Sequence, residues 1–174
     1  MAGSLIKIDE EIVTSAVASV TLTGIDSTYD VYMVTTNNVQ PTTDASVLGQ
    51  RVTVSATADS TANYDEAFKF LRTDTTFSDV SRTNQNNFLL STNLGTATGE
   101  VSNAIYYLYN FNNASEYSFM TAETSERNQS AGLFVGVQGG GVHTVQQSCD
   151  GIEFFFTNSS TIASGTFTLY GLKK

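Results

Sequence analysis

Hydrophobic and polar residues alternate along several short runs of the chain, and stretches rich in Thr, Asn, Ser and Gly separate these runs. The run at residues 48–57 is the clearest, because Leu48, Val52 and Val54 fall on one side of an extended chain. A period of two is typical of a strand with one buried face. Comparable runs predict strands at residues 5–8, 12–23, 29–36, 88–91, 104–111, 117–122, 133–137, 142–148, 152–157 and 166–172. Many short strands with polar turns between them predict an all-β fold, a two-sheet antiparallel β-sandwich of jelly-roll type.

Three segments interrupt this pattern. Residues 37–44 contain the only Pro of the chain, which predicts a turn. Residues 139–141 are consecutive glycines, which predict a turn or a bulge. Residues 59–87 are rich in Asp, Thr and Asn, which predicts one short strand and a long loop. We see no linker and expect a single domain, in which residues 1–25 are an N-terminal strand and attachment segment and residues 26–174 form the sandwich.

The composition supports the all-β interpretation and excludes several kinds of partner. Only 14% of the 174 residues are charged, against about 25% in a typical domain. The net charge is −9 and the eight Lys and Arg are not clustered, so we expect no binding to nucleic acid or to an anionic membrane. No apolar run reaches the ~20 residues of a membrane span, and the N-terminus lacks the apolar core of a signal peptide. We therefore expect the chain to be made in a cytoplasm and not to leave it by a standard secretion signal.

Two runs carry large apolar side chains on both faces. In residues 152–157, Phe155 points away from its two Phe neighbours, which we expect in the core. Residues 104–111 repeat the feature, with Tyr107 and Tyr109 on one face and further large side chains on the other. Either a long loop of the same chain covers the second face, or a second subunit does. The second alternative predicts an oligomer interface that includes Phe155, Tyr107 and Tyr109.

Residues suited to catalysis or to metal binding are scarce. The only histidine, His143, is six residues from the only cysteine, Cys149. In an extended strand this is about 20 Å, too far for a nucleophile and its base. We expect His143 to be a partly exposed strand residue and Cys149 a small, semi-buried one. The four Cys or His ligands of a structural zinc site are lacking, and we expect no cofactor and no metal.

The acidic residues of the loop-rich region leave two further interpretations. Asp65 and Asp74 are candidate carboxylates for glycoside hydrolysis, which needs a pair at a set separation. Alternatively, Asp59, Asn63 and Glu66 together with Asp65 could offer oxygen ligands to calcium, although the residue spacing of a calcium loop is absent. Solvated loop acids explain these residues more simply. We expect no enzymatic activity.

Several segments, in their order, resemble a family of small β-rich virion structural proteins of tailed phages, especially marine and cyanobacterial ones. The matching segments are Tyr29-Asp30-Val31-Tyr32, Asn38-Val39-Gln40-Pro41-Thr42-Thr43-Asp44, Leu48 to Ser55 with Arg51, Leu108-Tyr109-Asn110, Ile152 to Phe156, and Ile162-Ala163-Ser164-Gly165-Thr166-Phe167-Thr168-Leu169-Tyr170-Gly171. The C-terminal motif, Ser-Gly-Thr-x-x-Leu-Tyr-Gly, is the most specific of them. Ala45 and the Gly-free turn at residues 158–161 depart from the family pattern, and both changes affect turn geometry only. The resemblance implies a location in the virion without saying in which part.

These observations lead to two hypotheses about function. The first is a non-enzymatic virion protein, a decoration or cement protein that forms a homo-oligomer, for which we expect a trimer, and that attaches to the major capsid protein or to a tail protein. The second is a host-recognition module of a tail fibre or spike that binds a host-surface glycan. For the second, Tyr64 and Tyr117 beside Asn-rich loops are the candidate contacts, although the chain has no Trp to stack on a sugar.

Overall fold

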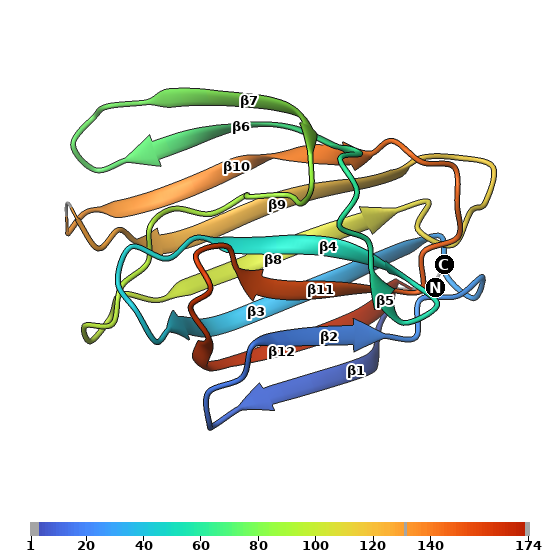
Figure 1. The fold of residues 1–174 in the computed structure, drawn as a ribbon, viewed down its shortest axis with the longest axis horizontal. Coiled ribbons are helices and arrows are strands. Elements are labelled where there is room, and N and C mark those ends of the chain that lie inside the picture. The colour runs from blue at the N-terminus through green and yellow to red at the C-terminus, as the bar shows by residue number, and fades with distance from the viewer. Residues whose placement is uncertain (1–3, 131, 173–174) are drawn as a thin grey trace.

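The computed structural model describes residues 4–130 and 132–172, and within them the chain forms twelve β-strands and no helix (Figure 1). The strands are β1 Leu5–Val13, β2 Ser19–Thr23, β3 Val31–Pro41, β4 Leu48–Val54, β5 Thr57–Ala58, β6 Tyr64–Arg72, β7 Ser78–Gln85, β8 Ser102–Tyr109, β9 Ser118–Arg127, β10 Phe134–His143, β11 Gly151–Phe156 and β12 Ile162–Leu172. Their pairings are antiparallel. The expected all-β fold with two antiparallel sheets is confirmed.

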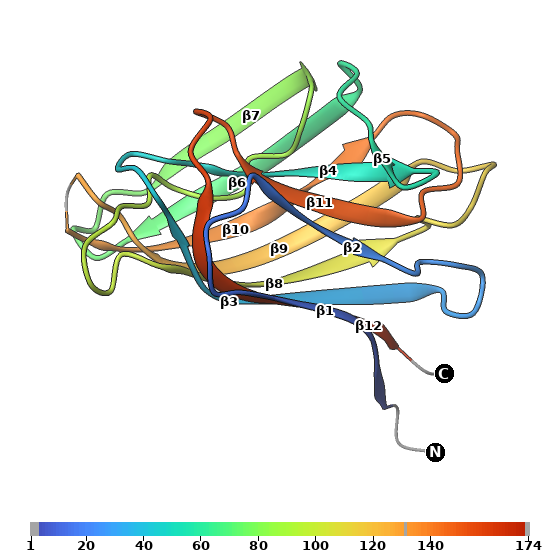
Figure 2. The same cartoon turned by 60° about the horizontal axis from the view of Figure 1, so that its bottom comes forward.

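The strands form a large and a small sheet that pack face to face (Figures 1 and 2). The large sheet has eight strands in the order β1-β12-β3-β8-β9-β10-β6-β7, and the small sheet has four in the order β2-β11-β4-β5. The small sheet lies over the part of the large sheet formed by β12, β3 and β8, whereas β6 and β7 extend beyond it (Figure 1). The large sheet therefore has an inner face towards the core and an outer face on the other side.

Side chains that alternate inward from both sheets build the core. Ile152 and Phe154 of β11 are fully buried, and Phe156 is 3% exposed. The ring of Phe154 lies 5.3 Å from that of Phe167 in β12 and 5.6 Å from that of Tyr106 in β8. The prediction that Phe154 and Phe156 belong to the core is confirmed.

The connection between β7 and β8, residues 86–101, packs against the core beside β4. Phe88 and Leu94 in this connection are almost completely buried, and each forms an isolated bridge to the chain at or just before β4. The prediction of a strand at residues 88–91 is therefore wrong. The apolar side chains of this segment are buried, but they belong to a loop that pairs with the chain near β4 only at single points.

Residues 59–87 form a hairpin of two long strands, β6 and β7, so the expected long loop is wrong. In β6, Tyr64, Glu66 and Phe68 all point inward and are buried. The carboxylate of Glu66 forms an ion pair with Arg82 of β7. A charged residue at an inward position broke the alternation of polar and apolar residues that would have revealed the strand.

The three glycines at residues 139–141 lie in the interior of β10, which runs through the predicted turn. A Cβ built on Gly139 would be 2.4 Å from the Cβ of Phe68, and one built on Gly141 would be 2.6 Å from the ring of Phe88. Any side chain at these positions would collide with the neighbouring chain. The glycines therefore allow the close approach of β6 and of the 86–101 connection, and they make no turn.

The turn expected at residues 37–44 is replaced over most of its length by strand β3, which continues to Pro41. The register of β3 against β8 shifts after Thr36, and Asn38 has a φ of 53°. The backbone N of Asn38 donates a hydrogen bond to Oδ1 of Asn103 at 2.9 Å. This arrangement is a bulge, in which one strand bends without ending.

The N-terminal segment supplies an edge strand to each sheet. β1 pairs with β12 at the edge of the large sheet, and β2 pairs with β11 at the edge of the small sheet. Residues 14–18 carry the chain from one sheet to the other, so the continuous strand expected at residues 12–23 is wrong. Residues 1–3 of the expected attachment segment lie outside the described part of the chain.

Candidate functional site

The outer face of the large sheet exposes large apolar side chains. β9 shows the alternation of the sheet most clearly, because every second residue from Ser118 to Glu126 is buried and those between are exposed. Among the outward side chains, Phe119 is 43% exposed, Ile105 41% and Tyr107 37%. Solvent-facing surfaces of sandwiches are usually polar, so this face is the first candidate for a contact surface.

One half of this outer face, at the end of the strands where β8 finishes and β9 begins, is apolar. In register across four strands, Val31 lies beside Tyr109, Tyr109 beside Phe119, and Phe119 beside Val142. In the next row, Tyr170 lies beside Met33 and Met33 beside Tyr107. We call these residues the apolar half: Val31, Met33, Tyr107, Tyr109, Phe119, Val142 and Tyr170. None of them carries a charge.

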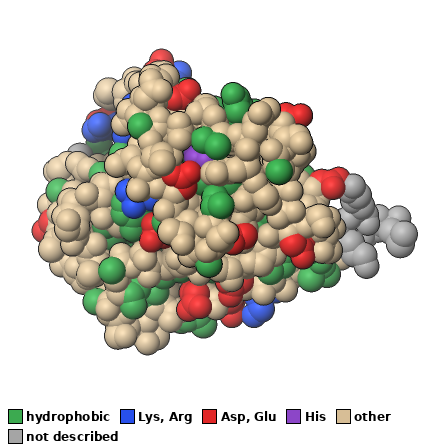
Figure 3. Space-filling model, turned by 45° about the vertical axis from the view of Figure 1, so that its right-hand side comes forward, with side chains coloured by type: hydrophobic (Ala, Val, Ile, Leu, Met, Phe, Trp, Pro, Cys, Tyr) green, Lys and Arg blue, Asp and Glu red, His purple; other side chains and the backbone are tan. Residues whose placement is uncertain are grey.

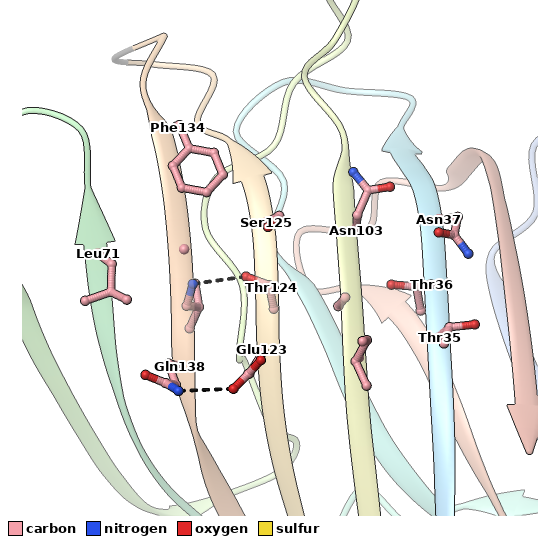
Figure 4. A pocket seen from close by; sticks show the side chains of 14 residues that line it. Thr35, Thr36, Asn37, Leu71, Asn103, Glu123, Thr124, Ser125, Phe134 and Gln138 are labelled. Atoms are coloured by element: carbon pink, nitrogen blue, oxygen red, sulfur yellow. Dashed lines mark hydrogen bonds between the residues drawn. The ribbon is translucent and has the colours of Figure 1, made fainter. Parts of the chain in front are cut away.

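The other half of the outer face is polar and is hollowed into a groove of about 620 Å³ (Figure 4). The outward polar side chains of this groove come from four adjacent strands and are Thr35, Asn37, Asn103, Glu123, Ser125 and Gln138. Nε2 of Gln138 donates a hydrogen bond to Oε1 of Glu123 at 3.1 Å. Together with the bond that Oδ1 of Asn103 accepts from Asn38, this contact fixes the orientation of three groove side chains.

Apolar side chains and one glycine complete the groove. Phe134 and Leu71 stand at one side, 51% and 38% exposed, and Ile105 lies among the polar residues (Figure 4). Gly136 lies between Leu71 and Ser125 in register and adds no side chain to the floor. A Cβ at Gly136 would meet only ordinary contacts, the nearest 3.6 Å away. Packing therefore does not require a glycine at position 136, whereas it does at Gly139, Gly140 and Gly141.

The three residues expected at an oligomer interface lie on opposite sides of the molecule. Tyr107 and Tyr109 belong to the outer face of the large sheet, whereas Phe155 of β11 points out of the small sheet. Phe155 is half-buried, because its ring lies over Gly49 and the guanidinium of Arg51 stacks on it at 4.1 Å from the ring centroid. One contact patch cannot include all three residues, and the chain itself partly covers Phe155.

The two tyrosines expected to contact a glycan differ in position. Tyr64 is fully buried, so its assignment as a glycan contact is wrong. Its hydroxyl donates to the backbone O of Asp59 at 2.6 Å and accepts from the backbone N of Val52 at 3.2 Å, which joins β6 to β4. The alternation in β6 that points Tyr64 inward was hidden by Glu66. Tyr117 is 42% exposed in the connection before β9.

His143 is fully buried beside Asp59, so the expectation of a partly exposed histidine is wrong. Its Nε2 lies 3.2 Å from Oδ2 of Asp59, which also accepts a hydrogen bond from Gln147 at 3.1 Å. Burial lowers the pKa of His143, although the nearby Asp59 carboxylate opposes the shift. The ring of Tyr64 packs on the imidazole at 4.7 Å. The histidine therefore belongs to a polar cluster inside the sandwich.

Cys149 and the acidic residues do not assemble into a reactive or metal-binding group. Cys149 is buried, and burial raises the pKa of its thiol to about 11, so the thiolate is scarce at neutral pH. Asp65 and Glu66 are adjacent in β6 and point to opposite faces. Asp74 pairs with Arg72 at 2.9 Å in the turn after β6. Within residues 4–130 and 132–172, no group of three or more His, Cys, Asp or Glu could hold a metal ion.

Two buried glutamates hold the 86–101 connection against the large sheet. Oε2 of Glu66 accepts a hydrogen bond from the backbone N of Leu89 at 2.8 Å. Glu126 of β9 accepts bonds from Ser102 Oγ at 2.7 Å, Ser91 Oγ at 2.9 Å and the backbone N of Thr92 at 2.6 Å.

Burial raises the pKa of Glu126 to about 7, because these hydroxyl and amide donors compensate only in part for the loss of water. No role was predicted for Glu126 from the sequence. The alternation along residues 118–126 could have placed it on the core face.

No helix in the described part of the chain is long and apolar enough to cross a membrane. A scan against protein-family models gave no match, and searches of curated proteins and of solved structures found no similar chain.

Proposed function

We propose that this chain is a non-enzymatic virion structural protein that forms a homo-oligomer through the apolar half of its large sheet. The observation that carries the proposal is the exposure of that half, where Tyr107 and Phe119 keep more than a third of their surface in water. The sequence segments that resemble phage virion proteins support the location in a virion. A decoration or cement protein on the capsid surface is the role we favour, with the major capsid protein as the partner.

The charge distribution favours a second copy of the chain as the occupant of the apolar half. The protein has a net charge of −9, and on the face shown in Figure 3 the acidic side chains are scattered with few Lys and Arg among them. Two such molecules repel each other over most of their surface. The apolar half itself carries no charge, and Asp65 beside Val142 and Lys7 beside Tyr170 lie at its edges, so two copies can meet there while few carboxylates are desolvated. A trimer would bring three such surfaces together on one particle site.

The order of eight strands supports the jelly-roll type of sandwich that we propose. The neighbours β1-β12-β3-β8 in the large sheet face β2-β11-β4-β5 in the small sheet. The connections β1 to β2, β3 to β4 and β11 to β12 each cross from one sheet to the other. In this description, β6, β7, β9 and β10 are additions that widen one sheet. Jelly rolls occur in viral capsid proteins and in lectins.

Sedimentation velocity of the purified chain tests the proposed contact. We expect the wild type to sediment as an oligomer and Tyr107→Asp to sediment as a folded monomer, because the new carboxylate cannot be buried against a second copy. Phe155→Asp is the matched control on the opposite side of the molecule, and we expect it to remain oligomeric. A monomeric wild type, or an oligomer that Tyr107→Asp leaves intact, contradicts the proposal.

Copy number per virion tests the role. Quantitative mass spectrometry of purified particles should give hundreds of copies for a capsid decoration protein. About a dozen copies on the tail would reject that role and favour the alternative, a host-recognition module of a tail fibre or spike. The groove in the polar half is the observation that favours this alternative.

A further inference from the structure

We propose that the groove in the polar half of the outer face binds a neutral oligosaccharide. The inference does not depend on self-association, because the groove lies at the other end of the strands from the apolar half.

The polar side chains of the groove suit hydroxyl groups. The amides of Asn37, Asn103 and Gln138 carry both donors and acceptors, of which the contacts with Asn38 and Glu123 use one lone pair of Asn103 and one N–H of Gln138. Thr35 and Ser125 add hydroxyls that can donate or accept. Sugar hydroxyls also donate and accept at once, so such a lining can bind them in many orientations. The bonds Gln138–Glu123 and Asn103–Asn38 hold these groups in position before a ligand arrives.

The charge of the lining selects a neutral ligand. Among the described residues that line the groove there is no Lys or Arg, and Glu123 is the only ionisable side chain. Lys69, which is paired with Asp79, and Arg127 lie at its border, beside Gln138 and Phe134 in register. Inside the groove, an anionic ligand such as a nucleic acid, a phosphate or a uronic acid would meet the repelling carboxylate of Glu123, and the two cations are at the border only. A glycosidase needs two carboxylates on either side of the scissile bond, so the single Glu123 indicates binding without hydrolysis.

The shape of the groove suits a chain of several sugars. It crosses from β3 to β6 and is an open hollow on the sheet, with a volume of about 620 Å³ (Figure 4). Phe134 is 51% exposed beside it, and an exposed ring can pack against the apolar face of a sugar. The bare Gly136 leaves room for that sugar next to Leu71. The glycan contact expected at Tyr64 is thus replaced by a different site on the opposite side of the large sheet.

The experiment is a glycan array followed by calorimetry with the full chain. The array carries fragments of bacterial surface polysaccharides and of algal and plant polysaccharides, both neutral and acidic, so that it also distinguishes the sources. We expect binding to at least one neutral oligosaccharide of four or more sugars. Binding to acidic glycans alone, or to no glycan at millimolar concentration, overturns the proposal.

Variants locate the site. Gly136→Tyr should abolish binding by filling the groove, and the strand should tolerate it because a Cβ there has ordinary contacts only. Phe134→Ala should weaken binding about tenfold, the order expected for loss of one aromatic contact. Tyr117→Ala, an exposed tyrosine outside the groove, is the control and should bind as the wild type does.

Thermal melting shows whether each variant is folded, and sedimentation shows whether it still assembles. A folded Gly136→Tyr that binds as tightly as the wild type contradicts the proposed site. Because Gly136→Tyr changes the groove and Tyr107→Asp the apolar half, the failure of one proposal is distinguishable from the failure of the other.

Discussion

The buried carboxyl group of Glu126 should make the stability of this protein fall as the pH rises, and Glu126→Gln should remove that dependence. Glu126 is almost completely buried, and its partners are two serine hydroxyls and one backbone amide. In the folded chain its pKa is about 7, whereas the ordinary value is 4.5. A group with a raised pKa holds its proton in the folded state after the unfolded state has released it.

The sign and size of the effect follow from these two values. Below about pH 4.5 the carboxyl is protonated in both states, and Glu126 carries no penalty. Between about pH 4.5 and pH 7 only the unfolded state ionises, so the free energy of unfolding decreases with rising pH. At about 1.36 kcal/mol for each pH unit, the loss reaches about 3 kcal/mol by pH 8. A glutamine cannot ionise, and the serine hydroxyls can rotate to accept from its amide.

Urea unfolding at pH 5, 6, 7 and 8, at one protein concentration, measures the effect. The quantity to compare is the difference in free energy of unfolding between Glu126→Gln and the wild type, because other titrations such as that of His143 then cancel. We expect this difference to rise by about 2.5 kcal/mol from pH 5 to pH 8, because part of the loss has already occurred at pH 5. Glu123→Gln on the exposed face of the same strand controls for the loss of one negative charge. A difference that stays constant with pH would mean that Glu126 is ionised in the folded chain, and the reasoning would be refuted.

Two further substitutions test the packing of the core. Phe154→Ala should lower the free energy of unfolding by about 3–5 kcal/mol, because it opens a cavity between Phe167 and Tyr106; a loss below about 1 kcal/mol in urea unfolding would contradict the position of that ring. Gly139→Ala should destabilise the chain by more than about 2 kcal/mol, because its Cβ has no room beside Phe68, whereas Gly136→Ala on the same strand should be nearly neutral. Equal unfolding midpoints for the two alanine variants would show that β6 does not approach β10 as closely as described.

The sequence pattern revealed the strands whose two faces differ. In β4, the inward Leu48 and Val52 are fully buried, and the strand lies close to where it was expected. The pattern in residues 152–157 placed Phe154 and Phe155 on opposite faces correctly, because that depends only on the geometry of one strand.

The pattern failed where a strand breaks its own alternation for a packing reason. Glu66 occupies a core position because Arg82 of the next strand accompanies it. Three glycines occupy β10 because the backbones of the neighbouring strands β6 and β9 and the ring of Phe88 lie too close for a side chain. Both features are set by a partner that is distant in the sequence, so the local pattern cannot show them.

The candidate site was only partly accessible from the sequence. Tyr107 and Tyr109 were identified from one strand, but their neighbours Phe119 and Val142 come from strands whose order is fixed by long-range pairing. The same limit explains why Phe155 was grouped with them. Two strands can share the same composition and still belong to different sheets. The groove could not be anticipated, because its lining comes from five strands and its floor depends on the position of Gly136.

The pairing of the first and last strands has a consequence for how the chain folds during its synthesis. β1 pairs Leu5 with Leu172, and β11 lies between β2 and β4 in the small sheet. Until residues 151–156 have left the ribosome, β2 has no partner in the small sheet and β4 has only the two-residue β5, so the small sheet cannot be completed on a nascent chain. Contacts of such high sequence separation make folding slow, on the order of milliseconds to seconds. Until the last part of the chain is made, the apolar inner face of the large sheet is therefore not fully covered by the small sheet.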